Sequence, residues 1–142
     1  MKMFSQFFTI ILISFLFLGG KSFAQNNEQP LLIVSFNQVS MSNMGTVSRL
    51  ADSLFVPILK ELVDEGMIYS FGQFNHSWGD EWNYNMWYTA KDMASFDKFW
   101  DEYVKRGSER HPGSFAAITK YFNAHKDNIY TIRNQYPIPP AR

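Results

Sequence analysis

The order of strand-like and helix-like segments is the feature that most limits the folds open to this chain. Alternating or continuous apolar runs predict strands at residues 31–39, 67–74, 82–90 and 127–133. Apolar residues spaced three and four apart predict helices at 47–63 and 93–106, with a short third helix at 114–123. The order strand, helix, strand, strand, helix, strand is the split βαβ arrangement, which forms an antiparallel sheet with both long helices on one face. The predicted class is therefore α+β.

The helix at 47–63 is the most regular of these segments and contains signals for its start, an interruption and its end. Its apolar residues form one stripe about five turns long. Ser42 and Asn43 precede it as candidate N-terminal caps. Pro57 is expected to kink it, because proline removes one backbone donor and crowds the preceding turn. Gly66 is a natural residue to follow the last turn.

The segments after this helix predict a hairpin and then a second capped helix. Residues 67–74 and 82–90 are joined by a polar connection and are expected to pair antiparallel. Asp92 can cap the helix at 93–106, and Gly107 is expected to end it. Alternation along 82–90 places two sets of side chains on opposite faces: Trp82, Tyr84, Met86, Tyr88 and Ala90 on one, and Asn83, Asn85, Trp87 and Thr89 on the other.

The first 24 residues have the layout of a secretory signal peptide. Lys2 precedes an apolar run over residues 7–18, and Ser22 and Ala24 supply the small residues of a cleavage site. The run is too short to span a membrane as a helix, which needs roughly 20 residues. We therefore expect an exported protein, periplasmic or extracellular, with no stable membrane anchor after cleavage. Residues 25–30 are predicted to be a flexible tail, 31–133 the single folded domain, and 134–142 a proline-rich C-terminal tail.

Composition excludes several functional classes. Cysteine is absent, which excludes disulfides, thiol catalysis and thiolate metal sites. Removal of Lys2 and Lys21 from the 13 basic residues leaves 11 against 13 acidic ones, so the net charge near −2 gives no reason to expect a nucleic-acid partner. His76, His111 and His125 show no metal-ligand spacing, and no metal is expected.

Aromatic residues form 18% of the chain and recur along the predicted strands, so both faces of the sheet are expected to be apolar. The helices cover only one face, and leaving the other in water would be costly. We expect two copies to pair these uncovered faces, forming a homodimer whose sheets close into a barrel.

From residue 31 to 133 the sequence resembles the dimeric α/β-barrel (ferredoxin-like) superfamily. The resemblance rests on element order, on the ending Asp64-Glu65-Gly66 of the first helix, and on a Trp87-Tyr88-Thr89 strand that leads into the Asp92 cap and a helix with Phe96 and Trp100. These are patterns of fold and not catalytic signatures. The superfamily includes monooxygenases, haem-degrading enzymes, isomerases, chlorite-decomposing enzymes and members with no known activity, so a shared fold does not transfer function.

The resemblance implies one specific candidate site. Haem-degrading members use an asparagine on the first strand, a tryptophan on the second helix and a histidine after it, and Asn37, Trp100 and His111 occupy similar places. On that basis His111 would ligate haem iron as a neutral imidazole, Trp100 would press on the macrocycle, and Asn37 would hydrogen-bond near the distal side. Pro112 places His111 in a loop, and Phe99 competes with Trp100 for the tryptophan position. The structural alternative is that Trp100 is core and Asn37 satisfies a strand end.

A cofactor-free oxygenase or isomerase is a second enzymatic interpretation. Such enzymes hold an enolate or phenolate with a few polar groups in a dry pocket. Tyr69, His76, Tyr84 and Tyr88 are the candidates for lining that pocket, together with Asn37. The structural alternative is that these aromatic residues only pack. No pattern identifies a general base, a phosphate loop or a nucleophile elbow.

The interpretation that requires the fewest assumptions is an exported dimeric barrel. It would bind a small apolar molecule in an aromatic pocket, without a cofactor. It needs only the predicted fold and the aromatic residues. The alternative is a monooxygenase-type enzyme, haem-degrading or cofactor-free, that uses Asn37, Trp100 and His111.

Overall fold

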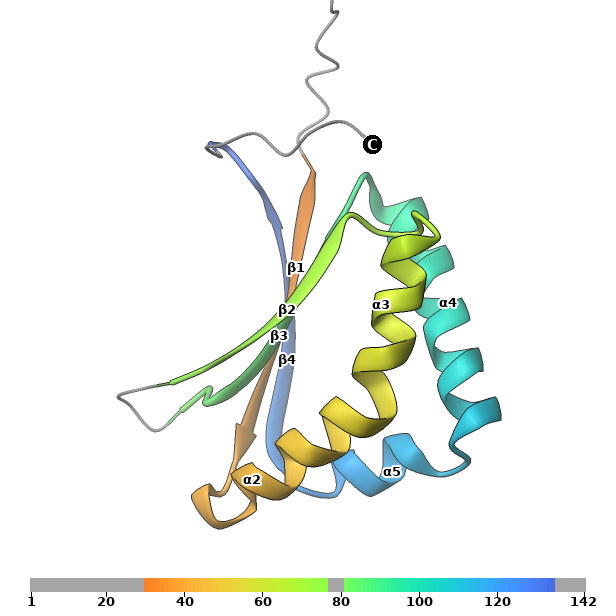
Figure 1. Cartoon of the computed structure of the whole chain (residues 1–142). Coiled ribbons are helices and arrows are strands. Elements are labelled where there is room, and N and C mark those ends of the chain that lie inside the picture. The colour runs from red at the N-terminus through yellow and green to blue at the C-terminus, as the bar shows by residue number, and fades with distance from the viewer. Residues whose placement is uncertain (1–29, 77–80, 135–142) are drawn as a thin grey trace, which may run out of the picture.

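The computed structural model describes residues 30–76 and 81–134. Strands β1 (Leu31–Val39), β2 (Ser70–Asn75), β3 (Tyr84–Ala90) and β4 (Phe122–Thr131) form one antiparallel sheet in the order β2-β3-β1-β4. Helices α2 (Met41–Leu50), α3 (Val56–Asp64), α4 (Met93–Arg110) and α5 (Ser114–Thr119) lie on one side of this sheet (Figure 1). The α+β, ferredoxin-like fold predicted from the order of segments is confirmed. The predicted signal peptide lies outside the described residues, as do all but one residue of each predicted tail.

The register of the sheet decides which side chains face the helices. Because directly opposed residues share a face, Ile33 and Tyr88 lie together, as do Asn37 and Tyr84. On the other side of β1, Asn37 is opposite His125 of the edge strand β4. The core fills the space between this face and the helices, and its least exposed large side chains include Tyr84, Phe99 and Leu59. Among the described residues, no helix has the length and apolar character needed to cross a membrane.

The helical segment predicted at 47–63 keeps its apolar stripe and is interrupted near Pro57. A π-helical turn, η1 (Ala51–Phe55), separates α2 from α3, and the Val56 N–H bonds to the Ala51 carbonyl five residues back. The wider turn accommodates Pro57, which sits in the first turn of α3 where a backbone donor is not required. Gly66 ends the segment as predicted, with a φ of 77° and the paired Gly66-to-Val63 and Met67-to-Leu62 hydrogen bonds of a Schellman motif.

The predicted caps of this segment were wrong. The helix begins at Met41, so Ser42 and Asn43 lie inside its first turn and Ser40 occupies the N-cap position without a side-chain cap bond. The Asn43 N–H bonds instead to the Ser40 carbonyl at 2.8 Å. The backbone satisfies this donor, so a side-chain cap is not needed there.

Helix α4 starts as predicted and ends later than predicted. The Asp92 carboxylate accepts the Ser95 N–H at 2.8 Å, which confirms the cap. The helix continues past Gly107 to Arg110, with His111 as its C-cap. Gly107 is required by packing and not by helix termination, because a Cβ there would lie 2.8 Å from the Phe115 ring.

The C-terminal boundaries differ most from the prediction. Helix α5 stops at Thr119 and not at residue 123, and β4 begins at Phe122 and not at 127. Residues 122–126 pair with 36–39 of β1, with a register shift at Gln38/Val39. Backbone pairing with a distant strand therefore outweighs the local helical pattern of this segment.

The antiparallel pairing of the predicted hairpin is confirmed, but its strands are shorter than predicted. Residues 67–69 and 82–83 fall outside them.

The sheet face opposite the helices is apolar in its centre and polar toward β4. Phe36 contacts Phe74 and Trp82 with ring centroids 6.3 and 6.5 Å apart, while Lys126 places its ammonium 4.3 Å from the Trp82 ring. Trp82 therefore packs on this outer face and not with Tyr84 as predicted, because it precedes β3 and is free of the strand's alternation. Phe74 and Tyr130 remain 42% exposed. On β4, Lys126 is opposite Phe36 and Asn128 is opposite Val34. The outer face is therefore not the uniformly apolar surface that the sequence had led us to expect.

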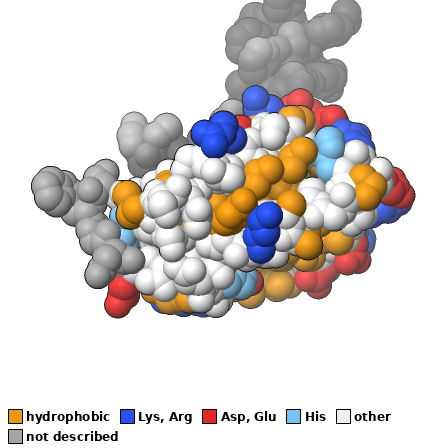
Figure 2. Space-filling model, turned by 90° about the horizontal axis from the view of Figure 1, so that it is seen from below, with side chains coloured by type: hydrophobic (Ala, Val, Ile, Leu, Met, Phe, Trp, Pro, Cys, Tyr) orange, Lys and Arg blue, Asp and Glu red, His pale blue; other side chains and the backbone are white. Residues whose placement is uncertain are grey.

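Exposed apolar surface is also found away from the sheet. Figure 2 views the end of the molecule at which α2 and α5 lie, and hydrophobic side chains form a band there with basic side chains on both sides. Met41, at the start of α2, is 78% exposed.

Candidate functional site

Four polar side chains form a continuous hydrogen-bonded chain on the helix-facing side of β1 and β4. The Asn37 Oδ1 lies 2.7 Å from the His125 Nδ1, and the His125 Nε2 lies 3.0 Å from the Asp127 Oδ2. The second carboxylate oxygen of Asp127 accepts the Ser35 hydroxyl at 2.5 Å. The antiparallel register produces this arrangement, since Asn37 is opposite His125 and Ser35 is opposite Asp127. We call these four residues the polar chain.

The polar chain has one buried end and one accessible end. Asn37 is only 3% exposed, and its backbone N–H bonds to the Asn85 side chain at 3.3 Å. The side chains of His125 and Asp127 are 47% and 57% exposed, because the helices do not cover the edge strand β4. A molecule in solution can therefore reach the imidazole and the carboxylate while Asn37 anchors the histidine from below.

The contacts of the polar chain indicate which of its atoms can donate and which can accept a hydrogen bond. With Asn37 Oδ1 as acceptor, the His125 Nδ1 carries a hydrogen and donates it. The His125 Nε2 faces a carboxylate, which is also an acceptor, so a proton between Nε2 and Asp127 is needed for this contact to be attractive. The contact between His125 and Asp127 is thus a hydrogen bond that joins the imidazole to a carboxyl oxygen.

Two tyrosines of β3 lie near the polar chain, and a third, Tyr103, belongs to α4. Tyr84 is opposite Asn37 across the sheet, and its hydroxyl is buried with no hydrogen-bond partner. The Tyr88 hydroxyl is 3.9 Å from the Met86 sulfur, and Met86 is opposite Ser35. Burial raises the pKa of Tyr84, Tyr88 and Tyr103, and the charge of Asp127 contributes to the shift at Tyr88. All three phenols are therefore neutral hydrogen-bond donors at ordinary pH.

Trp100 supplies an aromatic wall from α4. Its ring meets Tyr88 edge to face at 6.2 Å, stacks on Phe96 at 6.0 Å and contacts Tyr103 at 5.5 Å. Its side chain nevertheless remains 39% exposed. A partly exposed indole beside the buried phenols of Tyr88 and Tyr103 offers a flat apolar surface for a ring-shaped ligand.

The structure brings some predicted site residues together and separates others. Asn37, Tyr84, Tyr88 and Trp100 belong to this region, linked by strand pairing and ring contacts. His111 lies at the C-terminal end of α4, 11 residues beyond Trp100, which corresponds to about 16 Å along a helix. Asn37 is paired with His125 and not with His111. His76 directly follows β2.

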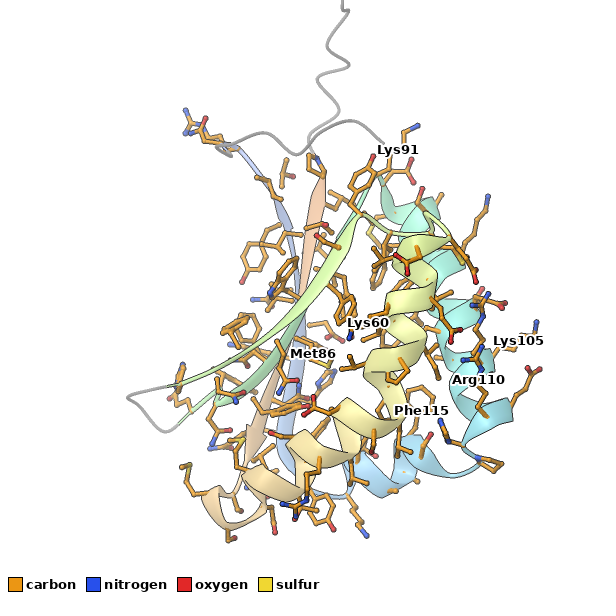
Figure 3. All side chains as sticks on the ribbon, in the orientation of Figure 1. Lys60, Met86, Lys91, Lys105, Arg110 and Phe115 are labelled. Carbon is orange, nitrogen blue, oxygen red and sulfur yellow. The ribbon has the colours of Figure 1, made fainter. Side chains whose placement is uncertain are left out.

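Tyr69 lies on a separate, shallow depression between α3 and β2. Lys60, Val63 and Asp64 of α3 and Ser70 and Phe71 of β2 line the same depression. Lys60 projects from α3 toward the sheet in Figure 3, whereas Lys105 points away from it. The depression is open to solvent, and its residues do not include Asn37, Trp100 or any histidine.

The residues present do not fit the haem site implied by the resemblance. An iron ligand needs a histidine nitrogen with a free lone pair, and both ring nitrogens of His125 are engaged by Asn37 and Asp127. His111 is about three helical turns away from Trp100. We therefore derive no step that involves haem. Within the described part of the chain, no cluster of three or more His, Asp or Glu side chains is arranged to hold a metal ion.

Sequence reasoning missed His125, Asp127 and Ser35 as site residues. His125 and Asp127 are two residues apart, the spacing that puts side chains on one face of a strand. This signal was lost because the strand was predicted to start at 127. Only the pairing of β4 with β1 brings the two residues beside Asn37 and Ser35.

The fold and site define a ferredoxin-like α+β protein with a polar chain at one edge of its sheet. No protein-family model matches the sequence, and no curated protein is significantly similar to it. Solved structures match it at the level of fold. A dimeric ferredoxin-like protein from an uncultured marine organism is 10% identical, with a TM-score of 0.63 over 79% of this chain and 96% of that one.

Two further solved structures show the same fold. A NIPSNAP family protein with unknown function from Agrobacterium tumefaciens is 8% identical, with a TM-score of 0.63 over 79% of this chain and 96% of that one. A conserved protein from Methanosarcina mazei is 20% identical, with a TM-score of 0.54 over 73% of this chain and 93% of that one. At these identities the similarity extends to the fold alone.

Proposed function

We propose that this protein is an exported homodimer that binds a small, planar, largely apolar molecule between α4 and the β1–β4 edge of the sheet. The observation that carries the proposal is the buried Tyr84 hydroxyl, which has no partner and belongs to the residue opposite Asn37 in the sheet. A buried hydroxyl without a partner costs about 1–3 kcal/mol, which a protein recovers when a ligand supplies the missing hydrogen bond. The exposed face of Trp100 supplies the apolar contact.

Ligands that fit this site have a flat ring and one oxygen-bearing group. The ring would lie against Trp100, and the oxygen would reach the donors of Tyr84, Tyr88 or His125. A few well-placed polar groups in an aromatic surround are the usual composition of a small-molecule site. Export follows in this proposal from the signal-peptide layout of residues 1–24.

The test is a fluorescence titration of the purified protein with 2-naphthol, a planar ring compound with one hydroxyl, followed by native mass spectrometry. We expect saturable binding of one molecule per chain and a loss of affinity of at least tenfold in Trp100→Ala. Tyr69→Ala, which alters the separate depression, serves as the matched control and should bind as the wild type does. Absence of saturable binding, or equal loss in both variants, contradicts the proposal.

The enzymatic alternative is favoured by one specific observation. A monooxygenase-type enzyme needs a polar group that exchanges a proton with its substrate, and the accessible His125–Asp127 pair is such a group, with Asn37 positioning it. In this alternative His125, and not His111, is the histidine positioned by Asn37.

A further inference from the structure

We propose that His125 and Asp127 act together as an acid–base pair that moves a proton between the carbonyl oxygen and the adjacent carbon of an enolisable ring compound. This inference rests on the proposed ligand site and names the substrate class that its polar pair fits. The substrate is a planar ketone or its enol, held against Trp100.

The geometry of the pair matches the two ends of a keto–enol unit. The His125 Nε2 and the Asp127 Oδ2 are 3.0 Å apart, and both are accessible. The oxygen and the α-carbon of a ketone are separated by a single carbon, so they can face a donor and an acceptor placed side by side. One group then gives a proton to oxygen while its neighbour takes one from carbon.

The step balances without any co-reactant. In the proposed step, His125 starts as the imidazolium and Asp127 as the carboxylate. The Nε2–H bond breaks and the proton passes to the carbonyl oxygen, while Asp127 removes a proton from the α-carbon. The C–H electron pair becomes the carbon–carbon double bond of the enol, and the carbonyl π pair becomes an oxygen lone pair that binds the proton. The products are neutral His125 and protonated Asp127, and transfer of the proton from Asp127 to Nε2 across their hydrogen bond restores the starting pair.

Neighbouring groups hold the pair in position. Asn37 fixes the imidazole through Nδ1 and is itself immobilised by burial, while Ser35 holds the second oxygen of Asp127. Ser35 and Asn37 are positioning residues because they act through Asp127 and His125. The neutral phenols of Tyr84 and Tyr88 can donate to the negative charge that develops on oxygen, which is the usual way a site stabilises an enolate.

The experiment uses 2-tetralone, a ring ketone with an acidic C1 position, as probe. Exchange of its C1 hydrogens for deuterium is followed by proton NMR in D2O with the wild-type protein, and 2-naphthol binding is measured on the same samples. We expect exchange well above the buffer rate. Asp127→Asn and His125→Gln should each lower the excess rate by roughly 10²-fold or more, and Asp127→Asn should change 2-naphthol affinity less than threefold. Asp101→Asn, at an exposed carboxylate of α4, is the matched control and should exchange as the wild type does.

The outcomes separate the two proposals. Binding of 2-naphthol with exchange at the buffer rate overturns the acid–base inference and leaves the ligand site standing. Exchange that persists in both Asp127→Asn and His125→Gln also overturns it. Absence of binding together with absence of exchange overturns both proposals. Circular dichroism of each variant confirms folding, which is expected because both side chains are about half exposed.

Discussion

At the residue scale, the need for glycine at position 107 comes from a side chain of another helix. Glycine inside a helix is less favourable than alanine by about 1 kcal/mol. It is required here because Phe115 of α5 packs onto the α4 backbone, with its ring 4.9 Å from Phe55 and 5.7 Å from Tyr103. The neighbouring rings on both sides leave Phe115 little room to move.

We predict that Gly107→Ala destabilises the protein by about 1 kcal/mol despite its better helix propensity, because the added Cβ would lie 2.8 Å from the Phe115 ring. The matched control is Gly45→Ala in α2, where the nearest atom lies 3.6 Å from the new Cβ. That variant should gain up to ~1 kcal/mol. Urea denaturation measures both, and a stabilised Gly107→Ala would show that the Phe115 contact is loose.

The buried hydroxyl of Tyr84 allows structural and functional roles to be separated. Removing a buried polar group that has no partner should not destabilise the fold. We predict that Tyr84→Phe unfolds at the same or a higher urea concentration than the wild type and binds 2-naphthol more weakly. Tyr69→Phe, at a half-exposed residue, should change neither quantity. A Tyr84→Phe variant that loses stability would indicate that the hydroxyl is satisfied within the folded chain.

At the scale of elements, α3 and α4 are joined by ion pairs on their outer side. Arg106 bonds both carboxylate oxygens of Glu65 at 2.7 Å and reaches Glu102 at 2.8 Å, while Arg110 bonds both oxygens of Glu61 at 2.8 and 2.7 Å. Hydrogen bonds from these arginines lower the pKa of all three carboxyl groups. The groups are solvent-exposed, so each pair contributes little alone, and the paired arrangement fixes how the two helices align.

The lowered pKa values predict loss of stability in acid. A carboxyl group whose pKa is lower in the folded state than in the unfolded state stabilises the fold above the unfolded value of about 4.3, and this contribution disappears as the pH falls through the folded pKa. We predict that the free energy of unfolding falls below about pH 4.5 and falls less steeply in Arg106→Met.

The control for the acid prediction is Lys60→Met, because Lys60 does not contribute to the shift of any of the three carboxyl groups. Its pH profile should parallel that of the wild type. Urea titrations between pH 3 and pH 7 measure the slopes. If the free energy of unfolding depends on pH equally steeply in the wild type and in Arg106→Met, these ion pairs are not the cause of the acid sensitivity.

At the scale of the whole molecule, the outer face of the sheet is the surface through which we expect two copies to associate. Its centre is apolar around Phe36 and Trp82, and Phe74 and Tyr130 are substantially exposed. A homodimer would bury this surface by packing the outer faces of the two subunits against each other, because a two-fold interface uses the same surface of both subunits. The solved protein from an uncultured marine organism with the same fold is dimeric.

We predict a mass of two chains at micromolar concentration by size-exclusion chromatography with light scattering. Phe74→Glu should raise the dimer dissociation constant at least tenfold, because it places a charge on the apolar surface to be buried. Met41→Glu, at an apolar residue away from the sheet, is the control and should leave the mass unchanged. A monomeric wild type would contradict the paired barrel.

Local patterns predicted the elements whose signals are contained in a few neighbouring residues. The strand 31–39, the Asp92 cap and the Gly66 terminus are in this group, because each depends on side chains and backbone within one or two turns. The predicted end of α4 at Gly107 failed because this glycine serves contacts with Phe115 and Phe55, which are 8 and 52 residues away in sequence.

The sequence alone determined the α+β class, because periodicity is a local property. Residue type suggested Tyr84 and Tyr88 as candidate site residues, and the resemblance to a known superfamily suggested Asn37 and Trp100. Only the tertiary structure selected His125 over His111 as the partner of Asn37 and added Asp127 and Ser35. The physical reason is that antiparallel pairing joins residues about 90 positions apart, and its register depends on the backbone of both strands together.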